Sequence, residues 1–255
     1  MSRGESLLPR QQARGVLDSS VQTAAYFDHV YRDNDRFWWR DGDRYARHAE
    51  AYPLSLLTQM LLRAIRDRPP GRALDLGAGE GTDSIRLALL GYQVDAVEIS
   101  PVAATKIARF ADEADVAVNV VVADISHFDP PGEYDVVICN GVLHYVENKE
   151  PVVASMQAAT KRDGLNVVSL WSSHTTVPAC HEIVPVFCDD EQGIVTKLYE
   201  PWHSEFLYFE RDKPETAHAD MPKHSHSHIK LIARNPRGLG SRISVPADPR
   251  VAAGG

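Results

Sequence analysis

Hydrophobic positions along the chain change their spacing near residue 70. Before that point they recur at the spacing of one helix face, first from Val21 onward, where Tyr26 and Val30 align, and again in LSLLTQMLLRAI after Pro53. The two prolines of RDRPPG at 66–71 end the second pattern, because proline lacks a backbone donor and disfavours helical geometry before it. We therefore expect two helices ahead of residue 70.

Short apolar runs then alternate with amphipathic segments over the next hundred residues. The pattern predicts helices at 81–91, 101–114 and 151–160, and strands at 73–76, 94–100, 116–124, 134–140 and 165–171. Apolar strands separated by helices are typical of a parallel sheet covered on both faces, and right-handed crossovers make that sheet doubly wound.

The last third of the chain follows a different pattern. A short helix is expected within 191–202, and strands at 206–213 and 226–236 are close enough to pair as an antiparallel hairpin at the sheet edge. The predicted fold class is α/β, a doubly wound Rossmann-like sheet of five parallel strands plus an antiparallel C-terminal hairpin, with a helical N-terminal cap. The expected limits are a flexible N-terminus at 1–20, the cap at 21–68, the main domain at 69–235 and a flexible tail at 236–255.

Composition and charge narrow the classes of function. The chain has 27 basic and 35 acidic residues, a net charge of −8, which disfavours a nucleic acid as partner. No apolar run approaches the roughly 20 residues that span a bilayer, and the first residues lack the apolar core of a signal peptide, so no membrane association is expected. Cys139, Cys180 and Cys188 form no paired-ligand spacing, which favours reduced thiols and a cytoplasmic protein.

A glycine-rich loop after the first parallel strand carries the clearest chemistry. In LDLGAGEG, the residues Gly77, Gly79 and Gly81 let the backbone turn tightly and approach a ligand, and the start of the next helix adds free N–H groups. Glu98 follows Gly81 by seventeen residues and ends the second strand, where an acid accepts hydrogen bonds from both hydroxyls of a ribose. Packing alone is the alternative role for an isolated pair of such glycines.

Two further strand ends point to the same place. The third strand ends in Asp124, whose carboxylate suits an adenine amino group, and the fourth ends in Asn140, beside the first strand. Because the carboxyl ends of parallel strands meet at one edge of a sheet, these residues predict a crevice for a ligand with adenine and ribose.

These segments resemble motifs of the class I S-adenosylmethionine-dependent methyltransferases. The resemblance rests on ALDLGAGEGTDSI, DAVEIS, VVVADI and YDVVICNGVLHYV and covers about residues 70–172. It implies S-adenosylmethionine as cofactor. The implied contacts are Asp75, Gly77, Gly79 and Gly81 with its amino-acid half, Glu98 and Ile99 with the ribose and adenine, Asp124 and Ile125 with the adenine, and Asn140 and Val142 with the sulfonium.

The resemblance also bears on the acceptor of the methyl group. The C-terminal segment and the LALLGY after the glycine loop look like the tellurite-resistance and small-molecule branch. The branches that act on nucleic acids or protein glutamine carry Asn/Asp-Pro-Pro-aromatic after the fourth strand, whereas this chain has NGVL at 140–143. The implied substrate is a small molecule, with a specialised metabolite as one option.

Methyl transfer is an in-line displacement that needs little acid–base help. Proximity and alignment contribute about 7–11 kcal/mol, so a base is required only for an acceptor that is protonated at neutral pH. His144 and His174 follow the fourth and fifth strands and are the candidate bases, with Asn140 in the same catalytic set. Tyr145 and Ser172 are weaker candidates. A hydrogen-bonded or solvated histidine without a chemical role is the alternative.

An aromatic group among charged residues, DNDRFWWRDGDRY, lies in the expected cap. We predict that Phe37, Trp38, Trp39 and Tyr45 close over the cleft and face the sulfonium or the substrate, where a desolvated cation–π contact contributes on the order of 2 kcal/mol. Tyr31 and Tyr145 belong to the same predicted set. A satellite core of the cap is the alternative. Adjacent tryptophans cannot share a face of a helix or strand, so one is expected in the core and the other at the site.

A histidine-rich segment raises the question of a metal. His224, His226 and His228 alternate along the last expected strand and share one face, about 7 Å apart per step. Alternate positions on one strand are poorly arranged to bind a single ion. The segment also contains His218, but beyond Asp220 it offers no Asp or Cys that could act as a further ligand, so no metal ligands are predicted. A polar strand edge or a pocket lining is expected instead.

Two alternatives to methyl transfer remain open. In the first, the cap seals the cofactor from water and the cofactor's amino group attacks its own Cγ, which yields azetidine-2-carboxylate and methylthioadenosine; azetidine-carboxylate synthases of this fold are lyases of that kind. In the second, the protein is a non-catalytic regulator that binds S-adenosylmethionine. A monomer or homodimer is expected in each case.

Overall fold

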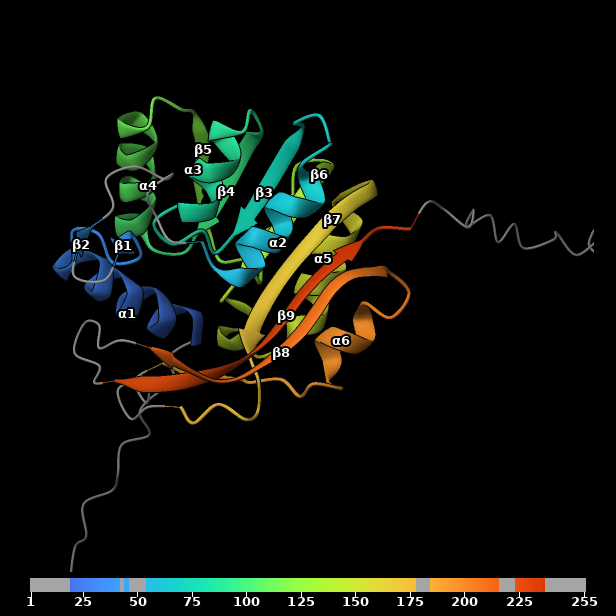
Figure 1. Cartoon of the computed structure of the whole chain (residues 1–255). Coiled ribbons are helices and arrows are strands. Elements are labelled where there is room, and N and C mark those ends of the chain that lie inside the picture. Colours follow the sequence, from blue (N-terminus) through green and yellow to red (C-terminus); the bar gives the residue numbers. More distant parts are fainter. Residues whose placement is uncertain (1–18, 42–43, 46–53, 178–183, 216–222, 237–255) are drawn as a thin grey trace, which may run out of the picture.

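A seven-stranded sheet forms the centre of the computed structural model, which describes residues 19–41, 44–45, 54–177, 184–215 and 223–236. The strand order is β5-β4-β3-β6-β7-β9-β8 (Figure 1). Five strands run parallel, namely β3 (Arg72–Leu76), β4 (Gln93–Glu98), β5 (Val118–Val122), β6 (Tyr134–Asn140) and β7 (Thr160–Trp171). The hairpin of β8 (His203–Glu215) and β9 (His224–Arg234) joins β7 in antiparallel fashion, so the predicted fold class is confirmed.

Helices cover both faces of the sheet because its strands are apolar on both sides. Along β6, Val136 and Ile138 pack into one core while Val137 and Cys139 pack into the other. Two helices cover the first core, α2 (Leu56–Ile65) and α3 (Thr82–Leu89), and α4 (Pro101–Glu113) lies next to α3. The second core is covered by α5 (Lys149–Ala158) and α6 (Ile194–Leu198). Among the described residues, no helix is both long enough and apolar enough to cross a membrane.

Element limits differ from the sequence pattern at a few points. Helix α2 begins at Leu56 because the side chain of Ser55 caps it through the amide of Thr58, while Pro53 lies outside the described residues. Strand β7 begins five residues before the expected Leu165, since Thr160 already pairs with Tyr134 ahead of a register shift.

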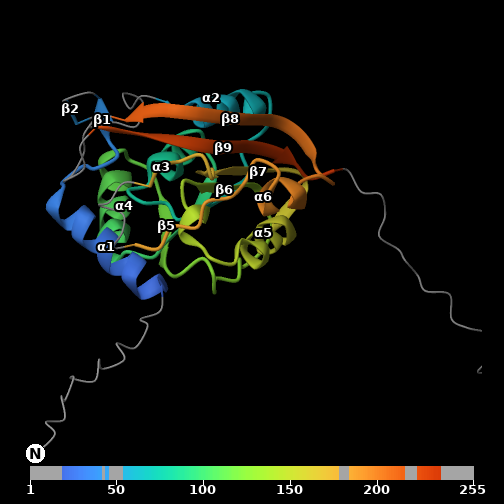
Figure 2. The ribbon, with the colours of Figure 1, turned by 90° about the horizontal axis from the view of Figure 1, so that it is seen from below.

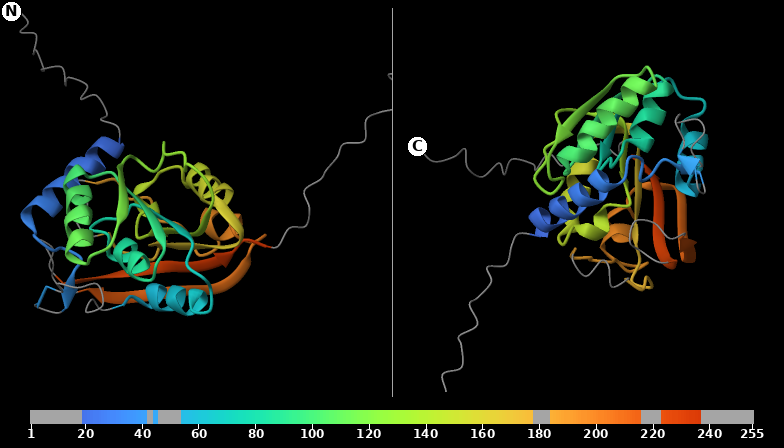
Figure 3. Two further views of the ribbon diagram at one scale, coloured as in Figure 1. Left: turned by 90° about the horizontal axis from the view of Figure 1, so that it is seen from above. Right: turned by 90° about the vertical axis from the view of Figure 1, so that its left-hand side faces the viewer.

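The N-terminal cap lies across the carboxyl edge of the sheet. It consists of α1 (Ser19–Asp33) and a small antiparallel pair, β1 (Arg40–Asp41) with β2 (Arg44–Tyr45). In Figures 2 and 3, α1 lies alongside the end of α4, where Val30, Tyr31 and Phe37 pack with Ala103. The position of the cap places its aromatic residues over the strand ends.

A buried carboxylate holds the cap in this position. Glu80, in the glycine-rich loop, is fully buried, and its two oxygens accept the backbone N–H groups of Phe37 (2.9 Å) and Trp38 (2.8 Å). The ammonium group of Lys106 on α4 pairs with the same carboxylate at 2.8 Å. Charge-assisted bonds from three donors compensate the desolvation of Glu80, so the cap, the loop and α4 are joined at one point.

We expect the substitution Glu80→Ala to lower the free energy of unfolding by about 3–5 kcal/mol, because it leaves the buried ammonium of Lys106 without its counter-charge. The matched control is Asp35→Ala, which removes a carboxylate that is 69% exposed and pairs with Arg109 of the same helix, α4. An exposed pair contributes at most about 1 kcal/mol. Urea denaturation measures both values, and equal effects of the two substitutions would contradict this role of Glu80.

Candidate functional site

A cavity of about 600 Å³ opens at the carboxyl edge of the sheet, beneath the cap. This volume lies within the range of small-molecule and cofactor sites. Its lining includes most of the residues singled out in the sequence: Tyr31, Phe37, Trp38, Asp75, Gly77, Gly79, Glu98, Ile99, Asp124, Ile125, Asn140, Val142, His144 and Tyr145. Residues from the cap and from four strand ends therefore meet at one place.

The glycine-rich loop approaches its neighbours too closely for side chains at two positions. A Cβ at Gly77 would lie 2.4 Å from a methyl carbon of Val142, and the φ of Gly77 is +73°. A Cβ at Gly79, where φ is +58°, would lie 3.0 Å from the hydroxyl of Tyr31 and 3.4 Å from the indole nitrogen of Trp38. Glycine is required at both places by the backbone and by the space available.

Glu98 lies at the end of β4 with its carboxylate buried. Its oxygens accept the backbone N–H groups of Gly79 (2.8 Å) and Ser100 (2.9 Å). Burial raises the pKa of Glu98 to about 7, although these hydrogen bonds lower it. Each carboxylate oxygen has a second lone pair, so the group retains capacity for the two hydroxyls of a ribose.

A second buried acid, Asp75, lies at the end of β3. It accepts a hydrogen bond from Ser84 (2.5 Å), and burial together with the charge of Asp83 raises the pKa of Asp75 to about 7. Asp83 also accepts a bond from the amide of Asn140 (2.9 Å), whose oxygen accepts one from Ser169 (2.7 Å). These two hydrogen bonds fix the orientation of Asn140 at the carboxyl end of β6.

The end of the cavity that is predicted to hold adenine lies after β5. There, Asp124 accepts the backbone N–H of Ser126 at 2.8 Å and approaches the ring of His127 at 3.4 Å, and its side chain remains 21% exposed. Ile125 is buried at the same place, and Ile99 also belongs to the lining. A partly exposed acid near apolar side chains suits the amino edge and the face of a purine.

The structure does not place four of the candidate residues in the lining. One is Ser172, which is buried beyond β7, where its hydroxyl oxygen accepts the backbone N–H of His174. Gly81 is the N-cap of α3 and packs against α4. A Cβ at this position would lie 3.1 Å from the side chain of Ile107. Trp39 is 2% exposed and packs against Phe110, with ring centroids 5.6 Å apart, so it belongs to the core. His174 is exposed in a turn beyond β7, and we no longer consider it a base.

His144 and Tyr145 form one wall of the cavity with Trp171. The ring of His144 stacks on Trp171 with centroids 4.2 Å apart and an interplanar angle of 9°, and its Nδ1 accepts the backbone N–H of Trp171 at 3.4 Å. Burial raises the pKa of Tyr145, so its hydroxyl stays protonated. His144 is therefore the one of the two predicted bases that reaches the cavity.

The C-terminal hairpin forms a further part of the cavity wall, which agrees with the pocket lining that the sequence analysis gave as one expectation for its histidine-rich strand. It contributes Lys213, Glu215, His226, His228 and Lys230 to the lining. Burial and the neighbouring Lys230 lower the pKa of His228 to about 4, so this imidazole is neutral. The signal available in the sequence was the placing of His224, His226, His228 and Lys230 at every second position of β9.

Comparison with known proteins agrees with this geometry. Residues 74–165 match the family model Methyltransf_12, described as a methyltransferase domain. This range contains the glycine-rich loop, Glu98, Asp124 and Asn140. Residues 74–165 carry a methyltransferase domain. The resemblance found in the sequence is thereby confirmed, and S-adenosylmethionine is the cofactor of such domains.

Several relatives share the methyltransferase domain. The ubiquinone biosynthesis O-methyltransferase of Rickettsia bellii is 25% identical over 52% of this chain and 56% of its own length. TehB of Haemophilus influenzae is 22% identical over 68% of this chain and 59% of its own, and its crystal structure superposes with a TM-score of 0.60 over 73% and 65% of the two chains at 18% identity. The chain spans about half the length of the curated relatives it matches.

A solved structure with bound cofactor has the same fold. Magnesium protoporphyrin IX methyltransferase (ChlM) from Synechocystis PCC 6803 with bound S-adenosylmethionine superposes with a TM-score of 0.57, 18% identity, and coverage of 88% of this chain and all of that one. The likeness to TehB agrees with the tellurite-resistance branch suggested by the sequence.

The two adjacent tryptophans of the methyltransferase cap are expected to respond differently to substitution. Trp38 is 39% exposed and lines the cavity. Trp38→Ala should weaken binding of S-adenosylhomocysteine roughly 5- to 30-fold, as expected for loss of about 1–2 kcal/mol of aromatic contact. Trp39→Ala should instead lower the free energy of unfolding by about 3–5 kcal/mol, because it opens a cavity in the core.

Calorimetric titration and urea denaturation of both variants test this difference. Unchanged affinity in Trp38→Ala, or unchanged stability in Trp39→Ala, would show that the division between site and core is wrong.

Proposed function

We propose that this protein is an S-adenosylmethionine-dependent methyltransferase that acts on a small molecule. The observation that carries the proposal is the convergence of the glycine-rich loop, Glu98 and the hydrogen-bonded pair Asp83–Asn140 on one cavity beneath an aromatic cap. The methyltransferase domain match supports the same conclusion. The domain limits remain a proposal as well, with the N-terminal segment at 21–68 and the methyltransferase domain at 69–235. Within that segment, α1 with β1 and β2 forms the cap, whereas α2 packs on the main sheet.

The cofactor is proposed to lie along the strand ends. The ribose hydroxyls would donate to the carboxylate of Glu98, the adenine would lie between Ile99 and Ile125 near Asp124, and the amino-acid half would lie against Gly77 and Gly79. A cationic ligand fits here because Asp75, Asp83 and Glu98 bring acidic groups together within a buried region.

The reaction itself would depend chiefly on alignment. Asn140, held by Asp83 and Ser169, and Tyr145 would border the methyl group, while Trp38 and Tyr31 exclude water from the sulfonium. His144 remains the proposed base for an acceptor that must lose a proton. Its single lone pair, on Nδ1, accepts the N–H of Trp171, so His144 would have to release that bond to take the proton. The aromatic cap and the polar hairpin wall favour an acceptor with an apolar body and a polar end.

The lyase and the regulator are distinguishable from methyl transfer by their products. The comparisons favour methyl transfer and give no support to the cyclising lyase. We expect that S-adenosylmethionine incubated with the protein alone remains intact, and that S-adenosylhomocysteine appears in the presence of a suitable acceptor from a panel of small hydroxylated aromatic compounds. Mass spectrometry of the products measures both.

Methylthioadenosine without an acceptor would contradict the proposal and support cyclisation. Binding of S-adenosylmethionine with no product from any acceptor in the panel would favour the regulator.

The raised pKa of Glu98 predicts a pH dependence of cofactor binding. Ribose hydroxyls donate to the ionised carboxylate, and at pH 6 only about a tenth of a group with a pKa of about 7 is ionised, so S-adenosylhomocysteine should bind about 10-fold more weakly at pH 6 than at pH 8. The stability of the ligand-free protein depends on pH in the opposite direction. Because the folded pKa is raised, the contribution of Glu98 is fully present below its unfolded value and is lost as the pH rises through about 7.

Glu98→Gln should bind more weakly at pH 8 and lose most of this pH dependence, with Asp75→Asn as the comparison that removes the other buried acid. Calorimetric titrations at the two pH values measure the effect. A pH dependence that is the same in wild type and Glu98→Gln would contradict the assignment of Glu98 to the ribose.

A further inference from the structure

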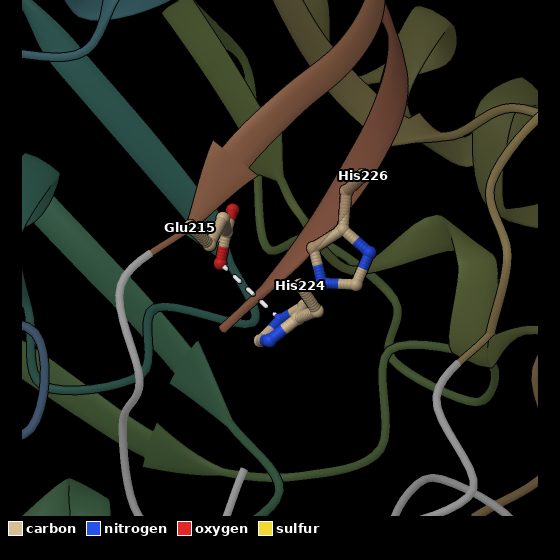
Figure 4. A group of neighbouring side chains, drawn as sticks. All are labelled: Glu215, His224 and His226. Atoms are coloured by element: carbon tan, nitrogen blue, oxygen red, sulfur yellow. Dashed lines mark ion pairs between the residues drawn. The ribbon is translucent and has the colours of Figure 1, made fainter. Parts of the chain in front are cut away.

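Three side chains of the C-terminal hairpin gather at the end of β8 and the start of β9. Glu215 pairs in register with His224, and Lys213 pairs with His226, so the carboxylate and both imidazoles lie on one face of the hairpin. Figure 4 shows Glu215 and His224 facing each other across the two strands, with the ring of His226 beside them.

The donor atoms of this cluster are close enough to share one ion. One ligand atom from each of Glu215, His224 and His226 lies within 4.8 Å of the others, and His224 Nε2 is 3.8 Å from Glu215 Oε2. Metal–ligand distances of about 2.0–2.2 Å in a tetrahedral site place two donors about 3.3 Å apart. Small side-chain rotations close that difference.

The surroundings of the cluster hold its ligands in place. His226 is 2% exposed and stacks on Trp171 with ring centroids 4.0 Å apart, while the side chain of His224 is 9% exposed. The opposite face of Trp171 carries His144, the candidate base. A fixed imidazole plane is what a metal ligand needs, because its second shell determines the direction of the nitrogen lone pair.

The cluster also faces the cavity of the proposed methyltransferase. Glu215 and His226 belong to the lining, and a ligand atom of His224 lies within 4.8 Å of theirs. The nearby cation Lys230 donates to Glu210 at 2.6 Å, so a carboxylate compensates its charge. Two imidazoles and one carboxylate are the donor set of catalytic zinc sites, in which three protein ligands leave a position open for water or substrate.

We propose that Glu215, His224 and His226 bind a divalent transition-metal ion of the Zn²⁺ type, whose open position takes an oxygen of the methyl acceptor. The role toward the acceptor rests on the proposed function, whereas the metal site itself does not. This proposal replaces the expectation of no metal ligands. That expectation rested on neighbours along one strand and on Asp220, which lies outside the described residues, whereas the carboxylate comes from the adjacent strand.

The ion would prepare a hydroxyl for attack. A coordinated hydroxyl has a lowered pKa and releases its proton to solvent. The resulting oxyanion forms a bond to the methyl carbon as the bond from that carbon to sulfur breaks. The electron pair of the broken bond stays on sulfur, so the sulfonium becomes the neutral thioether S-adenosylhomocysteine and the acceptor becomes a methyl ether.

Zn²⁺ binding to the full chain tests the proposal. After removal of metal with EDTA and dialysis, isothermal titration with Zn²⁺ and elemental analysis should show one tight site per chain. His224→Ala and Glu215→Gln should weaken that site at least roughly 100-fold, since even second-shell substitutions cost about 10–100-fold. The matched control is His203→Ala, which removes an exposed histidine that also lies near a carboxylate, Glu205 at 3.9 Å. It should leave the tight site unchanged.

Binding of S-adenosylhomocysteine, measured on every variant, shows that each one is folded. Zn²⁺ affinity that is unchanged in His224→Ala and Glu215→Gln, or lost equally in His203→Ala, would overturn the metal site. A wild-type protein that binds Zn²⁺ at this site but no S-adenosylhomocysteine would support the metal site and contradict the proposed function. With an acceptor in hand, metal removal should lower the methyl-transfer rate and Zn²⁺ should restore it, and a rate independent of metal would overturn the role toward the acceptor.

Discussion

The buried carboxylate of Glu80 is the constraint on which the geometry of the site depends. It lies inside the glycine-rich loop, yet it binds the backbone of Phe37 and Trp38 in the cap and the ammonium of Lys106 on α4. A fully buried charge must be compensated by several donors, so the cap can occupy few other positions without leaving Glu80 unsatisfied. Tyr31 and Trp38 are thereby held against Gly79, and the cap covers part of the crevice at the strand ends.

Inside that cavity the electrostatics favour a positively charged ligand. Asp75 and Glu98 are buried, and each has a pKa raised to about 7, with Asp83 as a further acidic neighbour of Asp75. Acids that are costly to ionise without a ligand become favourable partners for an ammonium or sulfonium group. Burying Asp75 and Glu98 costs free energy of folding, and ionisable groups with perturbed pKa values in a cleft commonly belong to a functional site.

Sequence patterns predicted those parts of the fold that depend on local order. The glycine-rich loop, the acid at the end of β4 and the alternation of strands and helices are contiguous signals, and the structure brings Gly77, Gly79, Glu98 and Asn140 together as expected. Contacts between segments that are distant in the sequence could not be predicted from these local patterns. Nothing local distinguishes Gly81, which packs on Ile107, from the two glycines at the cavity, and the choice between Trp38 and Trp39 depended on Phe110 in another helix. Likewise Glu215 meets His224 only through the register of a hairpin.

A crystal structure of the protein with S-adenosylhomocysteine tests the central claim most directly. The account predicts that the ribose hydroxyls contact the carboxylate of Glu98, that the sulfur lies beside Asn140 and Tyr145, and that Glu80 keeps its bonds to the cap. A ligand bound outside the cavity, or a ribose away from Glu98 with the cap displaced from Glu80, would contradict it.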